Sequence, residues 1–325
     1  MRLTNIRRLL SLCFLFLLCG MLIVFPSGLA HSLPADKLST EELVTKHLAS
    51  IGSTEDIAAS RTRVATGTTQ ARLRVTNTPV ELSGPAQVAS DGDKFLLAMV
   101  FSANNYPHEK VSFDGENAII GVLTQGGRTP LGTFIGSQSA LLKHGLIGGV
   151  LSSAWPLYNL DRRDAKVSYT GMDKINGKPV HKLKYTPRNA GDLTINLYFD
   201  ANTFQHVRSQ YEYVVSARQG AVAESSISQQ NTRYKLVEEF SDFQPTGKLV
   251  LPHTYIIDLT VELPNRTQTL KWTINLQQFV FNEPIDPRAF KGEEDREIKI
   301  GEPAKRATAF TTLRCRPLRG LNNIC

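Results

Sequence analysis

The stretches YIIDLTVEL (Tyr255–Leu263) and TLKWTINLQQFVF (Thr269–Phe281) decide what kind of fold this chain adopts. Along most of each stretch, an apolar or aromatic side chain alternates with a polar one. Successive side chains of a β-strand point to opposite faces of the sheet, so this period of two predicts strands with one dry and one wet face. Both stretches are therefore expected to be strands of an antiparallel sheet.

The middle of the chain continues this strand-forming pattern without a break. The segment INGKPVHKLKYTPRNAGDLTINLYFDANTFQHVRSQYEY (Ile175–Tyr213) contains three expected strands. Asn176-Gly177 and Asp200–Thr203 carry turn-forming residues between them. One face of the middle strand is wholly apolar and is expected to look inward; it is made of Leu193, Ile195, Leu197 and Phe199.

Other strands follow from the same pattern, and a hairpin is expected around Asp114-Gly115. The additional strand segments are Arg63–Val75, Asp93–Phe101, Glu109–Leu123, Val167–Met172 and Tyr234–Phe243. A polar stretch, Ser216–Gln230, indicates a loop. Roughly ten short strands joined by tight turns predict one antiparallel sheet, and a sheet of that width tends to curl.

Two helical regions interrupt this β pattern. Pro34–Ser60 contains a capping box at Ser39, apolar residues at helical spacing and a terminating Gly52, with a second short helix expected from Thr54. Gly126–Asp161 is rich in glycine and apolar residues and predicts two short helices between the two β-rich halves.

The N-terminus has the features of a secretory signal. Three arginines precede an apolar run, Leu9–Phe25, and small residues follow at Gly28 and Ala30. Cleavage after Ala30 is expected, with an uncleaved membrane anchor as the alternative. The residues before Cys13 and Cys19 are leucines, which argues against lipidation at either cysteine.

The net charge of +7 belongs to the two ends of the chain. The leader holds Arg2, Arg7 and Arg8, and Lys299–Cys325 holds six basic residues against one acid. Without these segments, basic and acidic residues are nearly equal in number. A near-neutral body argues against nucleic acid as a partner, because phosphate contacts need concentrated Lys and Arg.

The mature chain would keep two cysteines, Cys315 and Cys325, in its basic C-terminal tail. A pair of this kind in a secreted chain is a candidate disulfide, with two free thiols as the alternative. Neither cysteine has a histidine nearby in the sequence, so no metal site or cofactor is expected.

Known catalytic motifs are missing from the sequence. The seven histidines are isolated, and there is no phosphate-binding loop with its lysine and no nucleophile elbow. Glu238 and Glu239 are neighbours in an expected strand and so point to opposite faces, which excludes a carboxylate pair. We expect the protein not to be an enzyme.

A curled sheet whose dry face is covered by an incomplete helical lid encloses an apolar space. An acyl chain suits such a space, since burial of each CH₂ contributes about 0.8 kcal/mol. A solid core without a cavity is the alternative. The residues expected near the cavity, here called the predicted lining set, are Leu97, Met99, Leu141, Leu142, Trp155, Ile257, Leu259, Trp272 and Ile274.

The order of these elements resembles the LolA/LolB-type lipoprotein-carrier superfamily, and within it secreted outer-membrane lipoprotein-sorting-like proteins. The similar segments lie between Glu41 and Phe290: EELVTKHLASIGSTEDIAASR before VATGT, VSFDGENAI, INGKPVHKLKYTP, LTINLYFDANTFQHVRSQYEY, FSDFQPTGKLVLPHTYIIDL and FNEPIDPRAF. Together they cover about three quarters of the chain.

The resemblance implies a half-open β-barrel with a helical lid that binds lipid or lipoprotein acyl chains in the periplasm without chemistry. Carriers of this type latch the lid with an arginine on an early strand. The corresponding stretch here, ELSGPAQVASDGDKF, has no arginine, and Arg72 and Arg74 do not match the motif. Related domains also act as envelope-stress sensors.

These observations predict a mainly β protein with three parts: a signal peptide (1–30), a LolA-like lipid- or lipoprotein-binding domain (31–290) and a basic tail (291–325). The expected function is that of a periplasmic, non-enzymatic carrier of acyl chains, with membrane partner proteins on either side of the periplasm. The alternative is an envelope sensor or scaffold module with a filled core that binds a protein partner.

Overall fold

The computed structural model describes residues 38–75, 78–123, 127–188, 191–215 and 231–291. The expected signal peptide, the loop Ser216–Gln230, the basic tail and the Cys315–Cys325 pair lie outside the described residues.

Within the described ranges, twelve strands form one antiparallel sheet in the order β5-β4-β3-β2-β1-β12-β11-β10-β9-β8-β7-β6. Two meanders, β1 to β5 and β6 to β12, are joined where β1 pairs with β12. The strands are β1 (Thr62–Arg74), β2 (Val80–Asp91), β3 (Lys94–Val100), β4 (His108–Phe113), β5 (Ala118–Ile120), β6 (Ala165–Ile175), β7 (Lys178–Pro187), β8 (Thr194–Asp200), β9 (His206–Val215), β10 (Thr232–Thr246), β11 (Leu249–Leu263) and β12 (Arg266–Phe281).

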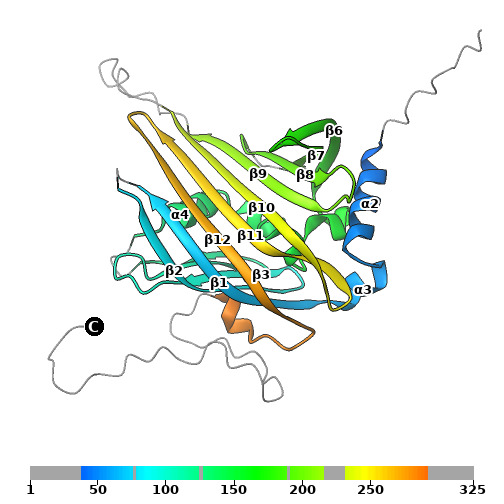
Figure 1. The fold of residues 1–325 in the computed structure, drawn as a ribbon, viewed down its shortest axis with the longest axis horizontal. Coiled ribbons are helices and arrows are strands. Elements are labelled where there is room, and N and C mark those ends of the chain that lie inside the picture. The colour runs from blue at the N-terminus through cyan, green and yellow to red at the C-terminus, as the bar shows by residue number, and fades with distance from the viewer. Residues whose placement is uncertain (1–37, 76–77, 124–126, 189–190, 216–230, 292–325) are drawn as a thin grey trace, which may run out of the picture. The chain divides into compact units, whose positions relative to one another are not determined.

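The connection from β5 to β6 carries the chain from one edge of the sheet to the other. It contains the helices α4 (Pro130–Ser137) and α5 (Ala140–Lys143) and the 3₁₀ turns η1 (Gly149–Leu151), η2 (Pro156–Tyr158) and η3 (Leu160–Arg162). We call residues 127–164 the crossing segment. Figure 1 shows the sheet curling around it. The expected curled, half-open antiparallel sheet with a helical cover is confirmed.

One large apolar core lies between the sheet and the crossing segment. Leu131, Phe134 and Trp155 of the crossing segment belong to the same buried cluster as Leu97 and Trp272 of the sheet. The apolar face predicted to look inward is confirmed, since Leu193, Ile195, Leu197 and Phe199 are all buried in this cluster.

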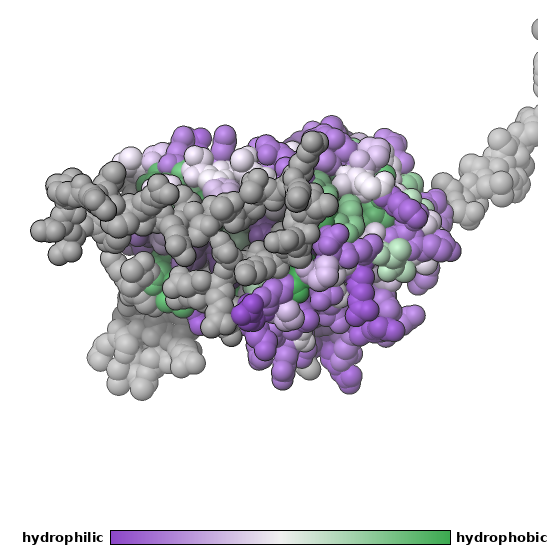
Figure 2. All heavy atoms as spheres, turned by 90° about the horizontal axis from the view of Figure 1, so that it is seen from below, coloured by the Kyte–Doolittle hydropathy of each residue, from purple (hydrophilic) through white to green (hydrophobic). Residues whose placement is uncertain are grey.

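A second, smaller cluster occupies the other face of the sheet. There the 3₁₀ helix η5 (Pro287–Lys291) places Phe290 against Val64 of β1 and Leu96 of β3. In the face that Figure 2 shows, the described residues are mainly hydrophilic, and the apolar ones form small separate areas.

Local signals account for the ends of the elements. Helix α2 (Thr40–Ile51) begins where Ser39 accepts a hydrogen bond from the Glu42 N–H at 3.0 Å, and it ends at Gly52, as the capping pattern predicts. Helix α3 (Thr54–Ala59) follows at once. The two-residue turn between β6 and β7 is Asn176-Gly177, and both residues have positive φ, at 50° and 80°.

The strand β2 was missed in the sequence because Gly84 and Pro85 hide its pattern. Proline cannot donate to a strand ladder, so it is tolerated where a strand lacks one neighbour. Here β2 pairs with β1 along its whole length, but its pairing with β3 begins only at Ala86. Strand β11 also begins earlier than its alternating part, at Leu249.

Candidate functional site

An apolar pocket of about 350 Å³ lies at the end of the sheet where β1 leads into β2. It exists because β2 extends past its pairing with β3, and the β3–β4 loop folds beside the unpaired part instead. Strand and hairpin residues form one side and loop residues form the other; the lining is Leu73, Val75, Thr78, Val80, Leu82, Ala103, Asn104, Asn105 and Tyr106.

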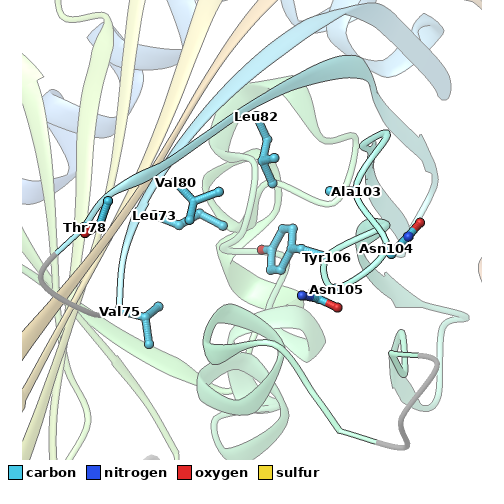
Figure 3. A pocket seen from close by; sticks show the side chains of 9 residues that line it. All are labelled: Leu73, Val75, Thr78, Val80, Leu82, Ala103, Asn104, Asn105 and Tyr106. Atoms are coloured by element: carbon cyan, nitrogen blue, oxygen red, sulfur yellow. The ribbon is translucent and has the colours of Figure 1, made fainter.

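The pocket has an apolar interior and polar groups at its mouth. Figure 3 shows Leu73, Val80 and Leu82 facing the Tyr106 ring across one space, with the Asn104 amide turned away. The valines on the hairpin side are partly open to solvent, Val75 at 38% and Val80 at 51%. Such a space favours an apolar chain over a charged group, because its lining contains no charged side chain to compensate the desolvation of a charge.

Tyr106, which forms the floor of the pocket, belongs to a buried hydrogen-bond network. The Tyr106 hydroxyl donates to the carboxyl group of Glu109, and the Thr129 hydroxyl donates to its other oxygen. Glu109 is buried, and burial raises the pKa of its carboxyl group to about 7, against the hydrogen bonds from Thr129 and Tyr106. Thr129 is also the N-cap of α4 and accepts from the Gly132 N–H at 2.9 Å.

A second buried carboxyl group, Glu238 of β10, joins the sheet to the crossing segment. It accepts hydrogen bonds from the Gly148 N–H at 2.9 Å, from the Tyr211 hydroxyl at 2.7 Å and from the Tyr255 hydroxyl. Gly148 has φ of 82°, and a Cβ there would lie 2.7 Å from the Phe95 ring, so only glycine fits. Burial raises the pKa of Glu238, while its three donors lower it.

A third polar group lies where α2, the crossing segment and β9 meet. His47 is hydrogen-bonded through Nδ1 to the Phe204 carbonyl, and its Nε2 accepts from the Trp155 indole N–H, both at 3.0 Å. The Trp155 ring stacks on His206 with centroids 4.5 Å apart. Burial lowers the pKa of His47 to about 4 and that of His206 well below its usual value, so both rings are neutral at pH 7.

Arg63 of β1 is a buried cation that also contacts the crossing segment. Its guanidinium donates to the Val150 carbonyl and to the Tyr158 hydroxyl, each at 2.9 Å. Sequence reasoning found no arginine at the position of the family's lid latch, yet this arginine on the first strand binds the covering segment.

The predicted lining set lies in the packed core. None of its nine side chains is more than 2% exposed. Leu97, Met99, Ile257, Leu259, Trp272 and Ile274 come from the sheet, and Leu141, Leu142 and Trp155 come from the crossing segment; all belong to one cluster. None of them lines the apolar pocket beside β1 and β2. That they line a lipid cavity stays a prediction.

Two of the predicted residues nevertheless lie close to the pocket floor. Trp272 lies opposite Ala71 in the β1–β12 pairing, two residue pairs from Leu73. Its buried indole N–H has no hydrogen-bond partner among the described residues. Burial raises the pKa of the nearby Tyr106 hydroxyl, and the Trp272 indole opposes that shift. Met99 is directly opposite Glu109 in the β3–β4 pairing.

Sequence reasoning missed the pocket itself and the three buried polar groups. The pocket residues 103–106 belong to a loop with no strand pattern, so only the folded chain places them beside β1 and β2. Glu109, Glu238 and His47 look like ordinary polar positions in the sequence. One signal was available: Glu238 lies on the apolar face of its strand, between Leu236 and Phe240.

Among the described residues, no group of three or more His, Cys, Asp or Glu side chains is placed to hold a metal ion. Within the same ranges, the helices are too short or too polar to cross a membrane.

No family model matches the chain, and no curated protein matches it. Among solved structures, a DUF1329 family protein from Desulfovibrio piger has 9% identity over 77% of this chain and 96% of its own, with a TM-score of 0.36. MucB of Pseudomonas aeruginosa, solved in complex with MucA, has 10% identity over 72% of this chain and 94% of its own, with a TM-score of 0.21.

A third solved structure is a domain from Vibrio parahaemolyticus assigned to outer membrane lipoprotein sorting. It has 11% identity over 77% of this chain and 94% of its own, with a TM-score of 0.39. Because these identities are about a tenth and the TM-scores lie below 0.5, the function of this chain has to be inferred from the pocket's own geometry. A lipoprotein-sorting domain, the kind of protein that the sequence motifs resemble, is thus among the solved structures similar to this chain.

Proposed function

We propose that this protein is a non-enzymatic carrier of the cell envelope that binds the acyl chain of a lipid or lipoprotein and works in the periplasm. The observation that carries the proposal is the apolar pocket at the end of the sheet where β1 leads into β2. Its volume of about 350 Å³ is at the lower end of the range for ligand pockets, roughly 300–1,000 Å³. It suits a single chain.

The arrangement of the walls sets the orientation of the ligand. The apolar tail would lie between Leu73, Leu82 and the Tyr106 ring, where each buried CH₂ contributes about 0.8 kcal/mol. The polar end would stay at the mouth beside Asn105, whose amide supplies a donor and an acceptor. Transfer would then consist of burial and release, with no bond made or broken.

A charge placed on the pocket wall tests this proposal. Val80 is 51% exposed, so Val80→Glu can keep its carboxylate hydrated in the free protein, but an acyl chain beside it would desolvate that charge. We expect at least a tenfold loss of affinity for a dansyl-labelled fatty acid, measured by fluorescence titration. Val215→Glu is the matched control, since Val215 is similarly exposed at 42% and lies outside the pocket.

Native mass spectrometry of the protein from its own cells gives an independent measurement. Acyl-bearing molecules that remain bound to the wild type but are lost from Val80→Glu would support the carrier. Equal binding of the fatty acid by the wild type and both variants, or no binding by any of them, would reject it.

The second candidate is a sensor or scaffold module that binds a protein partner. The observation that favours it is the burial of all nine residues of the predicted lining set in the packed core. Under this alternative the wild-type protein would bind no acyl chain, whereas cross-linking in intact cells would join it to a membrane protein of the envelope.

A further inference from the structure

Tyr106 separates the pocket from the interior of the protein. Its ring forms part of the pocket wall and packs on Phe101 with centroids 5.5 Å apart. Its hydroxyl donates a hydrogen bond to buried Glu109. The ring is therefore held by the hydrogen bond to Glu109, by the contact with Phe101 and by packing against the main apolar core.

Behind this ring lies the apolar core. The Trp272 indole N–H is close to the Tyr106 hydroxyl and has no partner of good geometry among the described residues. Met99 faces Glu109 across the β3–β4 pairing, and its sulfur contacts the Thr69 hydroxyl at 3.5 Å. Trp272 and Met99 belong to the packed core, so they are the side chains that a ligand would meet if the Tyr106 ring turned aside.

The same hydroxyl is connected to the crossing segment. One carboxyl oxygen of Glu109 accepts a hydrogen bond from the Tyr106 hydroxyl, and the other accepts one from the Thr129 hydroxyl. Thr129 is also the N-cap residue of α4. An N-cap residue of this kind stabilises the start of its helix. Moving Tyr106 removes one donor from buried Glu109, so opening costs one hydrogen bond of the network that also contains the N-cap of α4.

We propose that Tyr106 is the gate of the pocket and sets the length of acyl chain that the protein accepts. With the gate closed, a short chain fills the pocket; with the ring turned aside, a longer chain enters the core between α4 and the sheet. The proposal rests on the proposed acyl-binding function. It adds a specificity-determining residue, which interacts with α4 through Glu109 and Thr129.

A chain-length series tests the gate. Saturated fatty acids from octanoic to octadecanoic acid would compete with the dansyl-labelled fatty acid on the wild type, Tyr106→Ala and Tyr106→Phe. We expect Tyr106→Ala to bind the longest acids at least tenfold more tightly than the wild type does, with little change for octanoic acid. Tyr106→Phe keeps the ring but frees it from Glu109, so an intermediate shift is expected.

Acrylamide quenching of tryptophan fluorescence measures the gate without any ligand. Trp272 is fully buried, and opening at position 106 should raise its quenching in Tyr106→Ala. Trp155, buried at the junction with α2, gives a constant background. Tyr213→Ala, which removes a half-buried tyrosine outside the pocket, is the matched control and should leave both readouts unchanged.

The two proposals fail in different ways. If the wild type binds no fatty acid, the acyl-carrier function is wrong, and the quenching alone then decides whether Tyr106 shields the core. Suppose that the wild type binds fatty acid but that Tyr106→Ala keeps the same chain-length profile and the same quenching. The gating role of Tyr106 is then wrong, while the proposed acyl-carrier function is not contradicted. Tyr106→Phe, which removes one oxygen atom, keeps the test valid if Tyr106→Ala does not fold.

Discussion

At the scale of single residues, Glu238 shows how a polar side chain holds the core together. It is fully buried and accepts three hydrogen bonds, two from tyrosine hydroxyls of the sheet and one from the backbone of Gly148. Removing the acceptor leaves the Gly148 N–H and the Tyr255 hydroxyl without a partner, while the Tyr211 hydroxyl keeps the Leu146 carbonyl at 3.1 Å. Each unsatisfied buried group costs about 1–3 kcal/mol.

We therefore expect Glu238→Ala to lower the free energy of unfolding by about 3 kcal/mol or more. Its neighbour Glu239 offers a matched control: it pairs with Arg208 on the other face of the strand and is partly solvated. Glu239→Ala should cost less than about 1 kcal/mol. Urea denaturation of both variants measures the difference; equal losses would contradict the bridging role of Glu238.

His47 makes stability depend on pH. Its pKa is about 4 in the folded protein and near 6.5 in the unfolded chain, because burial disfavours the charged ring. The unfolded chain therefore binds more protons between these values, so the stabilisation is present above pH 6.5 and is lost as the pH falls toward 4.

The expected loss from His47 is about 3 kcal/mol between pH 7 and pH 4. His47→Gln removes this titration, so the gap in unfolding free energy between the wild type and the variant should shrink by that amount as the pH falls. Urea titrations of both proteins at several pH values measure the gap. A gap that stays constant with pH would show that His47 does not titrate in this window.

At the scale of elements, the crossing segment depends on contacts that it receives from the sheet. Its 3₁₀ turns are too short to satisfy their own backbone groups, so carbonyls such as that of Val150 need outside donors. Arg63 supplies one at 2.9 Å and reaches the Tyr158 hydroxyl with the same nitrogen. One arginine of the first strand thus binds two of the turns.

We expect Arg63→Met to loosen this part of the crossing segment before the sheet. Loss of the buried donor should cost about 1–3 kcal/mol and speed hydrogen exchange in residues 149–158, measured by mass spectrometry of peptides. Arg61→Met is the control, since Arg61 is exposed and close in sequence. Faster exchange throughout β9–β12 in Arg63→Met, with no excess in 149–158, would contradict a local role.

At the scale of the whole molecule, the two meanders share one core. β1 and β12 join them by hydrogen bonds, and the crossing segment packs against both. Because neither meander buries its apolar face alone, they should unfold together.

The expected result is a single transition in urea, with the same midpoint by far-ultraviolet circular dichroism and by tryptophan fluorescence. Trp155 reports on the crossing segment and Trp272 on the centre of the sheet, and both belong to the same cluster. Two separate midpoints would show that the meanders are independent units.

The sequence by itself determined the local structure. The alternation in β11 and β12, the Asn176-Gly177 turn and the capping box at Ser39 were predictable because each depends on neighbours within a few residues. The wide antiparallel sheet followed from the number of strands and the shortness of their turns. Strand β2 was not predicted, because Gly84 and Pro85 interrupt its pattern. They are tolerated there because the pairing of β2 with β3 begins only at Ala86.

Only the tertiary structure decided where the pocket lies and which polar groups meet. Tyr106 and Leu73 are distant in sequence, and neither stands out in the pattern of its segment. They line the same pocket because β2 extends past its pairing with β3, and the β3–β4 loop lies beside the part of β2 that β3 leaves unpaired. Glu238 and Gly148, or His47 and Trp155, meet because the crossing segment must return from one edge of the sheet to the other. Such contacts depend on the path of the whole chain, which no short window of sequence contains.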